Sequence, residues 1–503
     1  MAGVIGSGVE TIAHVLDRAL AERPAAEAVV ARSGTLTYRQ LDALADAAAA
    51  ALWARGVRPG DRVAACLPND LDVVGAFHGA QRIGAVWVGI GEALTESEQR
   101  SLFEHCAPTA LLAGPQCKLS EPAVITGPEW SDLCACAPAA PRVETDPHAP
   151  GGIAYTSGTT GRPKGIVHSQ HNLLLPGAVL VASRGWGPGL RKGDCLPLTI
   201  LNMLVLTTLL TAQAGGCCVV MDRRDAAGIA EWIARERIGV WNGAPPQLFD
   251  LARHPELDLS SLTEVWSGGG DCSDQLRHSF HAVHGQRIRA TYGLTEAPTV
   301  VAIDPVDGQW QPSASGRVLP HLRVTACDGA GNSLEPGMEG ELRIHATETG
   351  PWAGAWTPML GYWEDGAVRP AADAGLTADI GTVDAQGWLA VVGRKKVVVV
   401  RGGANVYPAE VERVLTAAPD VAAAAVFGIP DERLGERVAA LVEPVGDHVD
   451  LDRLREVCGR ELARYKVPEV WAAVPALPTN AMGKVIRTGL AELLATALTT
   501  HVD

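Results

Sequence analysis

Segments typical of β-strands alternate with segments typical of α-helices over most of the first 300 residues, and this pattern restricts the fold strongly. One run consists of DRVAACLPN (61–69), LDVVGAFHGAQRIG (71–84), AVWVGI (85–90) and LTESEQRSLFEHC (94–106). Similar units recur through residues 216–300. Because such alternation is typical of mainly parallel sheets covered on both faces, we predict a large α/β domain. Its helices should include one that ends before Gly56 and one that begins at Thr95.

The pattern changes after about residue 315, where shorter strand-like pieces such as HLRVTACD and GELRIHA are separated by Gly and Asn turns. Beyond a boundary near residues 393–397, the remaining segments suggest a compact α+β unit. A chain of 503 residues also exceeds what one core usually supports. We therefore predict an N-terminal α/β domain (1–395) of parallel-rich sheets with flanking helices and a β-rich end. A small α+β C-terminal domain (396–503) follows.

Charge and composition exclude several classes of protein. The chain has 42 basic and 57 acidic residues, and its net charge of -15 disfavours nucleic-acid and anionic-membrane binding. Cys195–Met221 carries no charge and could span a bilayer. Its Pro197, Asn202 and Gly215–Gly216 instead favour a buried helix, a turn and a short strand, so we expect no membrane span. The eleven cysteines lack zinc-site spacing, and the N-terminus lacks a secretory signal, which together predict a cytoplasmic protein with reduced thiols.

One loop carries the clearest functional signal. YTSGTTGRPKG, Tyr155–Gly165, follows the apolar stretch GGIA and precedes IVHSQHNLLL. Its small residues let backbone N–H groups approach phosphates, its threonines and serine add hydroxyl groups, and Lys164 adds positive charge. It is not a Walker A loop, because Lys164 does not directly follow the second glycine. The sequence predicts a phosphate-binding loop.

Four further segments follow in order: YGLTEA (Tyr292–Ala297), TADIG (Thr377–Gly381), GRKKVVVVRGGANVYPAEVE (Gly393–Glu412) and PTNAMGKVIR (Pro478–Arg487). Together with the first loop they resemble the ordered motifs of the adenylate-forming superfamily, which contains acyl-CoA ligases, peptide-synthetase adenylation domains and firefly luciferase. The resemblance covers nearly the whole chain. The segment GGANVYPAEVE resembles the acyl-CoA ligase branch, and no carrier-protein segment follows it.

The resemblance implies a carboxylic acid:CoA ligase that works through an acyl-adenylate. ATP and the acid would give acyl-adenylate and pyrophosphate, and coenzyme A would then give acyl-CoA and AMP. Since the first step brings an anion toward a polyanion, cations and fixed donors must offset the repulsion. ATP, Mg²⁺ and coenzyme A are the cofactors and substrates implied.

The resemblance also assigns roles to single residues. The phosphates would be held by the loop residues Thr156, Ser157, Gly158, Thr159, Thr160, Gly161 and Lys164. Thr295 and Glu296 would position Mg²⁺ and the α-phosphate. The nucleoside would be bound by Asp271, Tyr292, Gly293, Asp379 and Arg394, with Tyr292 against adenine and Asp379 on the ribose hydroxyls.

The family alternates between two orientations of its small domain, and this implies a mobile C-terminal domain here. Lys484 would bridge the substrate carboxylate and the α-phosphate during adenylation. Lys396 would be the hinge. In the second orientation, the loop with Gly402 and Gly403 would replace Lys484 and line the path of coenzyme A, since glycine suits a close approach to a ligand.

Several positions depart from the family pattern. Ile200 stands where the family usually has an aromatic guard of the acyl site, Asp271 where it usually has proline, Ala378 where it usually has glycine, and Val397 after the hinge where it has a polar residue. We expect the acyl pocket to include Ile200, Leu201, Trp241, Gly243, Trp266, Gly268 and Gly269. Such a lining suits a bulky hydrophobic or aryl acid of secondary metabolism. The two tryptophans could instead be core residues.

Three alternatives remain open at this stage. The substitutions around the acyl and hinge regions also fit a ligase that only converts a preformed acyl-adenylate to its thioester. A stand-alone enzyme that loads a carrier protein is the second alternative. A nucleotide-binding regulatory protein is the third, although retention of Glu296, Asp379 and Lys484 argues against it. The oligomeric state is open, with a homodimer among the options.

Overall fold

The fold was analysed in a computed structural model that describes residues 10–156, 164–269, 272–307, 310–395, 397–402, 404–480 and 483–500. Two large sheets form most of the molecule. The first has nine strands, parallel from β1 to β13 and antiparallel at both ends. In spatial order its strands are β15 (Arg317–Val318), β14 (Ala297–Ile303), β13 (Ile288–Leu294), β12 (Glu264–Ser267), β11 (Val240–Gly243), β9 (Arg191–Asp194), β10 (Cys217–Val220), β1 (Glu27–Ala31) and β2 (Gly34–Thr37).

The second large sheet has eight strands, of which the five from β7 to β6 are parallel. In spatial order they are β19 (Ala367–Arg369), β18 (Gly361–Glu364), β8 (Lys164–Ser169), β7 (Pro150–Thr156), β4 (Val86–Gly89), β3 (Arg62–Cys66), β5 (Ala110–Ala113) and β6 (Val124–Thr126). The predicted α/β fold with parallel-rich sheets is confirmed.

Helices cover these sheets and begin where the sequence provides a capping side chain. Thr95 forms a capping box with Glu98, as predicted, and Gly56 has a φ of +90° just after the helix that it was expected to follow. The helices of this part are η1 (Ile12–His14), α1 (Asp17–Glu22), α2 (Tyr38–Ala54), α3 (Leu71–Arg82), α4 (Glu96–Cys106), α5 (Gly127–Cys136), α6 (Gln170–Arg184), α9 (Ala226–Glu236), α10 (Pro245–Leu251) and α11 (Asp274–His284).

The uncharged segment is buried inside the protein. It contains α7 (Leu201–Leu204), the π-helical turn η2 (Val205–Leu209), α8 (Leu210–Ala214) and then β10. Gly215, with a φ of +68°, ends α8. This is the predicted order of helix, turn and strand, and none of the described helices combines the length and apolarity needed to cross a membrane.

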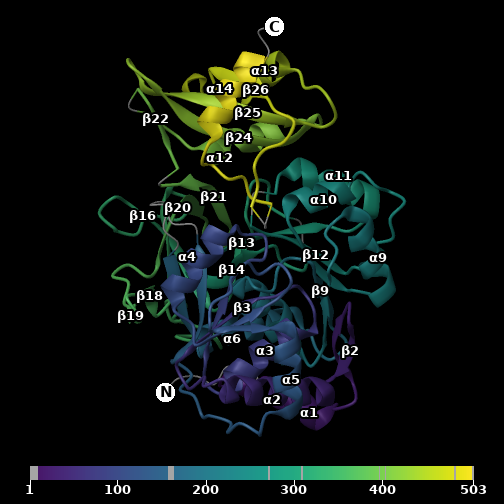
Figure 1. The fold of residues 1–503 in the computed structure, drawn as a ribbon. Coiled ribbons are helices and arrows are strands. Elements are labelled where there is room, and N and C mark those ends of the chain that lie inside the picture. Colours follow the sequence, from purple (N-terminus) through teal and green to yellow (C-terminus); the bar gives the residue numbers. More distant parts are fainter. Residues whose placement is uncertain are drawn as a thin grey trace.

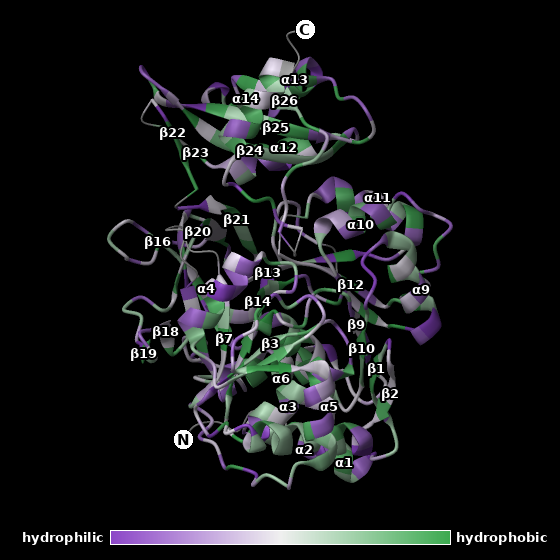
Figure 2. Ribbon diagram, viewed as in Figure 1, coloured by the Kyte–Doolittle hydropathy of each residue, from purple (hydrophilic) through white to green (hydrophobic). Residues whose placement is uncertain are grey.

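Helix α6 connects the two large sheets. Leu174 packs in a core with strands of the eight-stranded sheet, whereas its neighbour Leu175 packs in a second core with β11, β12 and β14. Apolar residues accordingly concentrate along the strands, and polar residues on the outer helices and loops, as Figure 2 shows. Packing from both sides fixes the relative position of the motifs that the two sheets carry.

The remaining two sheets come from the C-terminal part of the chain. A four-stranded sheet contains β16 (Leu322–Cys327), β17 (Gly340–Ala346), β20 (Leu376–Val383) and β21 (Leu389–Arg394), which gives the predicted β-rich end. A five-stranded sheet contains β23 (Ala404–Val406), β22 (Val399–Arg401), β25 (Gly435–Pro444), β24 (Val421–Asp431) and β26 (Val470–Ala473). Its helices are α12 (Pro408–Thr416), α13 (Leu451–Glu461), η3 (Arg464–Lys466) and α14 (Leu490–Thr500).

The five-stranded sheet and its helices form a small unit above the rest of the molecule (Figure 1). It contacts the four-stranded sheet where Arg413 donates a 3.0 Å hydrogen bond to the carbonyl of Val391. The yellow segment between β26 and α14 descends from this unit toward α10 and β21 in Figure 1. That segment contains the lysine motif.

Candidate active site

The predicted phosphate loop connects two paired strands. Thr156 ends β7 and pairs with Lys164, which begins β8, so the hairpin fixes both ends of the loop. Ser157, Gly158, Thr159, Thr160 and Gly161 lie outside the described residues. Lys164 is exposed, and its Nζ lies 5.3 Å from the centre of the Tyr362 ring. This distance permits a cation–π contact, which directs the lysine toward β18, the neighbour of β8 on the side away from β7.

Glu296, like Lys164, lies near the ring of Tyr362. Burial, together with the negative charges of Glu296 and Glu364, raises the pKa of Tyr362, so the ring has Lys164 on one side and Glu296 nearby. The carboxylate of Glu296 makes no hydrogen bond or ion pair with any other residue that the structure describes. It is therefore available to a cation.

A buried histidine holds the residue before Glu296. His168, on β8, donates from Nε2 to the carbonyl of Thr295 over 2.7 Å. Burial lowers the pKa of His168 to about 4, which keeps the ring neutral near pH 7. The bond ties the strand after the phosphate loop to the Thr295–Glu296 turn, although the two are 127 residues apart.

Tyr292, Asp379 and Arg394 form one hydrogen-bonded group. The Tyr292 hydroxyl donates to Oδ2 of Asp379 over 2.7 Å, and Nε of Arg394 donates to Oδ1 over 2.7 Å. Asp379 is 3% exposed, and Thr377 accepts a 3.1 Å bond from its backbone N–H. Burial lowers the pKa of Arg394, but the charge of Asp379 outweighs it and raises the pKa overall. Arg394 therefore stays charged.

The residue before Asp379 has a strained backbone. Ala378 has a φ of +57°, in the left-handed region where a Cβ atom is crowded. Its carbonyl accepts a 2.9 Å hydrogen bond from the N–H of Lys395, and Asp379 pairs with Arg394 in the sheet register. Glycine, which the resembled family usually has here, would adopt this conformation without strain.

Lys484, on the small unit, lies within range of the charges of Asp379 and Arg394. Burial and the charge of Arg394 lower the pKa of the Lys484 amine, against the opposite effect of Asp379. The side chain nevertheless keeps access to solvent. The loop is fixed because Asn480 Oδ1 accepts a 3.0 Å hydrogen bond from the Lys484 N–H. A Cβ atom on Gly483 would lie 3.3 Å from Pro246, so this loop packs against the start of α10.

Glycines occupy positions where the backbone approaches closely. A Cβ atom at Gly293 would lie 1.7 Å from the Thr299 carbonyl oxygen, so no larger residue fits. A Cβ atom at Gly268 would lie 2.6 Å from the Thr291 hydroxyl. Gly269 is exposed with a φ of +81°, and Asp271 lies outside the described residues.

The predicted guard of the acyl site, Ile200, comes just after a loop that the side chain of Asn69 holds. The amide of Asn69 donates to the carbonyls of Leu196 (2.9 Å) and Met221 (3.1 Å) and accepts from the N–H of Leu198 (2.9 Å). Ile200 follows this loop as the residue before α7 and is half-buried. Leu201 is only 2% exposed and packs against Gly152.

Both tryptophans of the predicted acyl pocket lie in the core. Trp241 is 0% exposed and packs with helices α9 to α11, and its ring fills the space beside Gly243. Trp266 is 1% exposed, stacks on Trp186 at 5.6 Å and donates to Glu264. The structure therefore supports the core alternative, because large aromatic rings fill the layers between sheet and helices better than a ligand-facing surface.

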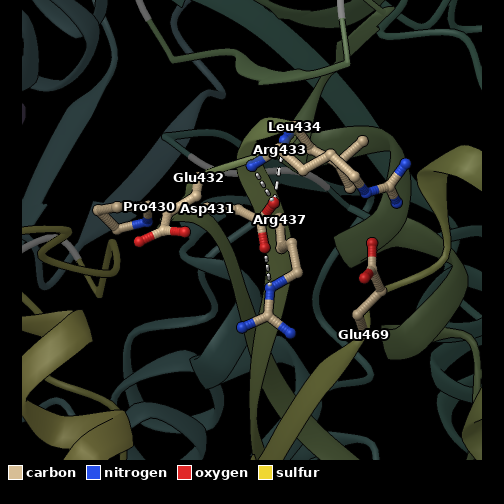
Figure 3. Close-up of a pocket in the computed structure, with 7 residues that line it drawn as sticks. All are labelled: Pro430, Asp431, Glu432, Arg433, Leu434, Arg437 and Glu469. Carbon is tan, nitrogen blue, oxygen red and sulfur yellow. Dashed lines mark hydrogen bonds and ion pairs between the residues drawn. The ribbon is translucent and has the colours of Figure 1, made fainter.

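The structure describes only part of the predicted hinge and of the predicted coenzyme A path. Lys396 and Gly403 lie outside the described residues. Gly402 is exposed, has a φ of +57° and donates a 2.7 Å hydrogen bond to the carbonyl of Leu434. Leu434 also belongs to an open pocket of about 580 Å³ on the small unit (Figure 3), whose other lining residues are Pro430, Asp431, Glu432, Arg433, Arg437 and Glu469.

No cluster of three or more His, Cys, Asp or Glu side chains suited to a metal occurs among the described residues. A single available carboxylate still fits Mg²⁺, which commonly binds through one or two carboxylates together with the phosphates of the nucleotide. Glu296 has that property.

Sequence reasoning missed three residues that shape this site. His168 is the only polar residue between Gly165 and Ser169, and this interruption of an apolar strand was the available signal. Asn69 precedes a helix and resembles an ordinary turn residue. Tyr362 lies outside every motif, so nothing in the sequence indicated that it lies near Lys164 and Glu296.

Comparison with known proteins agrees with this geometry. Residues 16–363 match the AMP-binding enzyme family, and residues 410–484 match the AMP-binding enzyme C-terminal domain. The chain is 31% identical to the long-chain-fatty-acid–CoA ligase FadD13 of Mycobacterium tuberculosis, over 91% of this chain and 93% of that protein. It is also 31% identical to the indoleacetate–CoA ligase of Aromatoleum aromaticum, over 95% and 97%.

A solved structure gives the same result. ATP-bound MatB from Rhodopseudomonas palustris has a TM-score of 0.84 and 27% identity, over 96% of this chain and 98% of that one. The family match extends over more than half of the chain. This protein therefore belongs to the AMP-binding family of adenylate-forming enzymes.

Proposed function

We propose that this protein is a carboxylic acid:CoA ligase that acts through an acyl-adenylate. The observation that carries the proposal is the hydrogen-bonded Tyr292–Asp379–Arg394 group, with Lys484 within range of its charges. These residues come from three separate sheets or loops, and a purely structural role gives no reason for a lysine amine there. Relatives named as CoA ligases for a fatty acid and for indoleacetate support the same reaction class.

In the first step, a carboxylate oxygen of the acid attacks the α-phosphorus of ATP, and the bond to the β-phosphate oxygen breaks. Acyl-adenylate and pyrophosphate result. Asp379 would accept hydrogen bonds from the ribose hydroxyls, and the Lys484 ammonium would bridge the acid and the α-phosphate. Lys164 and the N–H groups of its loop would hold the β- and γ-phosphates. Charge stabilisation of this kind is usually the largest contribution to such a transfer.

Glu296 would hold Mg²⁺, with Thr295 beside it. Bound there, the ion supplies positive charge to the phosphate oxygens of ATP. His168 keeps this carboxylate in place through the Thr295 carbonyl. The buried, neutral ring does so without adding charge of its own.

In the second step, the thiol of coenzyme A attacks the acyl carbon, AMP leaves, and the thiol proton is released. We place the domain boundary near Lys396 and propose that the small unit rotates there between the two steps. Lys484 would then withdraw, and the Gly402–Gly403 segment would line the path of the pantetheine. The pocket in Figure 3 lies beside Gly402, so it would lie near this path.

Mass spectrometry of thioesters tests the proposal. The protein is incubated with ATP, Mg²⁺, coenzyme A and a panel of fatty, aryl and arylalkanoic acids, and a CoA thioester should form only when all components are present. A thioester formed from a synthetic acyl-adenylate but never from the acid would favour the thioesterification-only enzyme. Transfer to a carrier protein but not to coenzyme A would favour a loading enzyme. No adenylate and no thioester from any acid would contradict the proposal.

A further inference from the structure

Asn242 lies at the end of β11, directly before Gly243, and its side-chain amide is buried. The residue is 7% exposed, and its Oδ1 atom has no hydrogen-bond partner among the described residues. Leaving such an acceptor buried and unpaired is destabilising, because its interaction with water is lost and not replaced. Most buried polar groups are paired, so this amide requires an explanation.

The strand of Asn242 lies beside a buried charged group. Strand β11 pairs with β9, where the backbone N–H of Asn242 helps to lower the pKa of the Asp194 carboxyl, although burial raises it overall. Asp194 also accepts 2.5 Å bonds from Lys192 and from Thr207 of the π-helical turn, and Lys192 and Asp194 are both 0% exposed. Because charged hydrogen bonds are strong, this buried group holds β9 in place, the strand beside which Asn242 lies.

The Asn242 side chain points toward the nucleotide motif. Asn242 pairs in register with Trp266, so the two side chains share a face of the sheet. Trp266 belongs to the same apolar cluster as Tyr292, Leu294 and Ala297, the residues that flank Thr295 and Glu296. The face that carries Asn242 is therefore the face on which the nucleotide motif packs.

The lysine motif packs against the residues that follow Asn242 in the sequence. Ala244 follows Asn242 by two residues, and a Cβ atom on Gly483 would lie 3.7 Å from it. Gly483 directly precedes Lys484. Asn242 thus lies near both the groups assigned to the nucleotide and the loop of Lys484, the lysine assigned to the acid carboxylate, from which the acyl part of an acyl-adenylate extends.

We propose that the Asn242 amide binds a hydroxyl or amino substituent on the acyl part of the substrate. This inference rests on the proposed function and narrows its substrate class. The acid would be largely apolar but would carry one hydrogen-bonding group, which donates to Oδ1. A site built around such a bond discriminates strongly against the analogue that lacks the substituent, because the buried amide is then left unpaired.

The test uses stable acyl-adenylate mimics, so that it does not depend on turnover. N-acylsulfamoyl adenosines are made in matched pairs: benzoyl with 3-hydroxybenzoyl and with 2-aminobenzoyl, and 3-phenylpropanoyl with 3-(4-hydroxyphenyl)propanoyl. Dissociation constants are measured by calorimetry for the unaltered protein, for Asn242→Leu and for Asn242→Asp. Asn332→Leu, in an exposed turn, is the matched control.

The unaltered protein should bind the substituted member of at least one pair tenfold more tightly or better. Asn242→Leu should reduce that ratio to less than twofold, while Asn242→Asp, which keeps an acceptor, and Asn332→Leu should preserve it. An unchanged ratio in Asn242→Leu would overturn the assignment. The assignment would also fail if the unaltered protein showed no preference for the substituted mimic of any pair. A higher melting temperature of Asn242→Leu in that case would indicate that the amide contacts only solvent.

The same experiment separates this inference from the proposed function. If the predicted ratios appear but no acyl-CoA forms from the corresponding acids, the assignment of Asn242 stands and the ligase proposal fails. If acyl-CoA forms from both members of each pair at equal rates, and the mimics bind equally, the ligase proposal stands and the assignment fails. If no mimic binds, both are wrong.

Discussion

Tyr292 and Asp379 are joined by a 2.7 Å hydrogen bond although they are 87 residues apart and belong to different sheets. Arg394 occupies the other carboxylate oxygen over the same distance. The carboxylate is therefore oriented before any ligand binds, which reduces the entropic cost of binding. A ribose diol would have to share Asp379 with these two donors rather than meet a free side chain.

Removing the tyrosine hydroxyl should weaken nucleotide binding. Tyr292→Phe keeps the ring but leaves Asp379 with one fixed oxygen, and the loss of one such bond, about 0.5–1.5 kcal/mol, predicts an increase in the KM for ATP of roughly 2- to 13-fold. The measurement is ATP–pyrophosphate exchange at varied ATP. Tyr38→Phe is the control, because that buried hydroxyl binds Gly216 elsewhere in the fold and should affect only stability. An unchanged KM in Tyr292→Phe would contradict the role of Asp379 in nucleotide binding.

Ala378→Gly should stabilise the protein. The left-handed conformation costs an L-residue about 1–2 kcal/mol, whereas glycine loses about 0.5–1 kcal/mol through the greater entropy of the unfolded chain. The net gain in the free energy of unfolding should be about 0.5–1 kcal/mol, measured by urea denaturation. Ala390→Gly, in the adjacent strand without a positive φ, should instead destabilise the protein. A loss of stability in Ala378→Gly would mean that its Cβ makes contacts worth more than the strain.

The order of the elements and the polar groups at the nucleotide site could be predicted from short sequence segments. Tyr292, Asp379, Arg394 and Lys484 each lie in a motif whose spacing is local. The structure joins the first three by hydrogen bonds and places Lys484 within range of their charges. Thr95 was predictable for the same reason, since a capping box involves residues only three positions apart.

Features that depend on packing between distant segments could not be predicted. Trp241 and Trp266 both follow the pattern of a buried strand, and only the elements packed on each face determine which apolar cluster each ring joins. The contact of His168 with Thr295 requires the two large sheets to be placed relative to each other. The unpaired amide of Asn242 is likewise visible only when all its neighbours are known.

His168→Leu should slow adenylation without altering its pH dependence between pH 5 and 8. The substitution removes the donor to the Thr295 carbonyl, and a loss of roughly tenfold in kcat corresponds to about 1.4 kcal/mol. Because burial lowers the pKa of His168 to about 4, its ring does not titrate in that range. His171→Leu is the control, since His171 bonds to Ala355 instead. If the adenylation rate of His168→Leu no longer changed with pH near neutrality where that of the unaltered protein does, His168 would do more than position Thr295.

The pH dependence of adenylation should report on Lys484. Its pKa lies below the ordinary 10.5 because of burial and Arg394, so the ammonium form is lost at a lower pH than in a free lysine. The adenylation rate should therefore fall as the pH rises through this lowered pKa. Arg394→Met removes a repulsive charge and should move the alkaline limb to higher pH, whereas Asp379→Asn removes an attractive charge and should move it lower. Arg453→Met, on helix α13 of the small unit, should leave the alkaline limb of the pH profile in place. Alkaline limbs at the same pH in all variants would exclude Lys484 as the titrating group.

Arg433 should affect the second step and not the first. It lines the pocket beside Gly402, and its backbone N–H donates a 3.0 Å hydrogen bond to Asp431. Its guanidinium makes no hydrogen bond or ion pair with other described residues, whereas Arg437 and Arg401 pair with Asp431 and Glu469. An unpaired guanidinium suits a phosphate. Arg433→Ala should raise the KM for coenzyme A by roughly tenfold, the effect of one charged hydrogen bond, while ATP–pyrophosphate exchange stays unchanged. With coenzyme A that lacks its 3′-phosphate, Arg433→Ala should leave the KM unchanged. Arg455→Ala, a control on the same unit, should leave the KM for intact coenzyme A unchanged. An equal increase for both forms of coenzyme A in Arg433→Ala would show that Arg433 does not bind that phosphate.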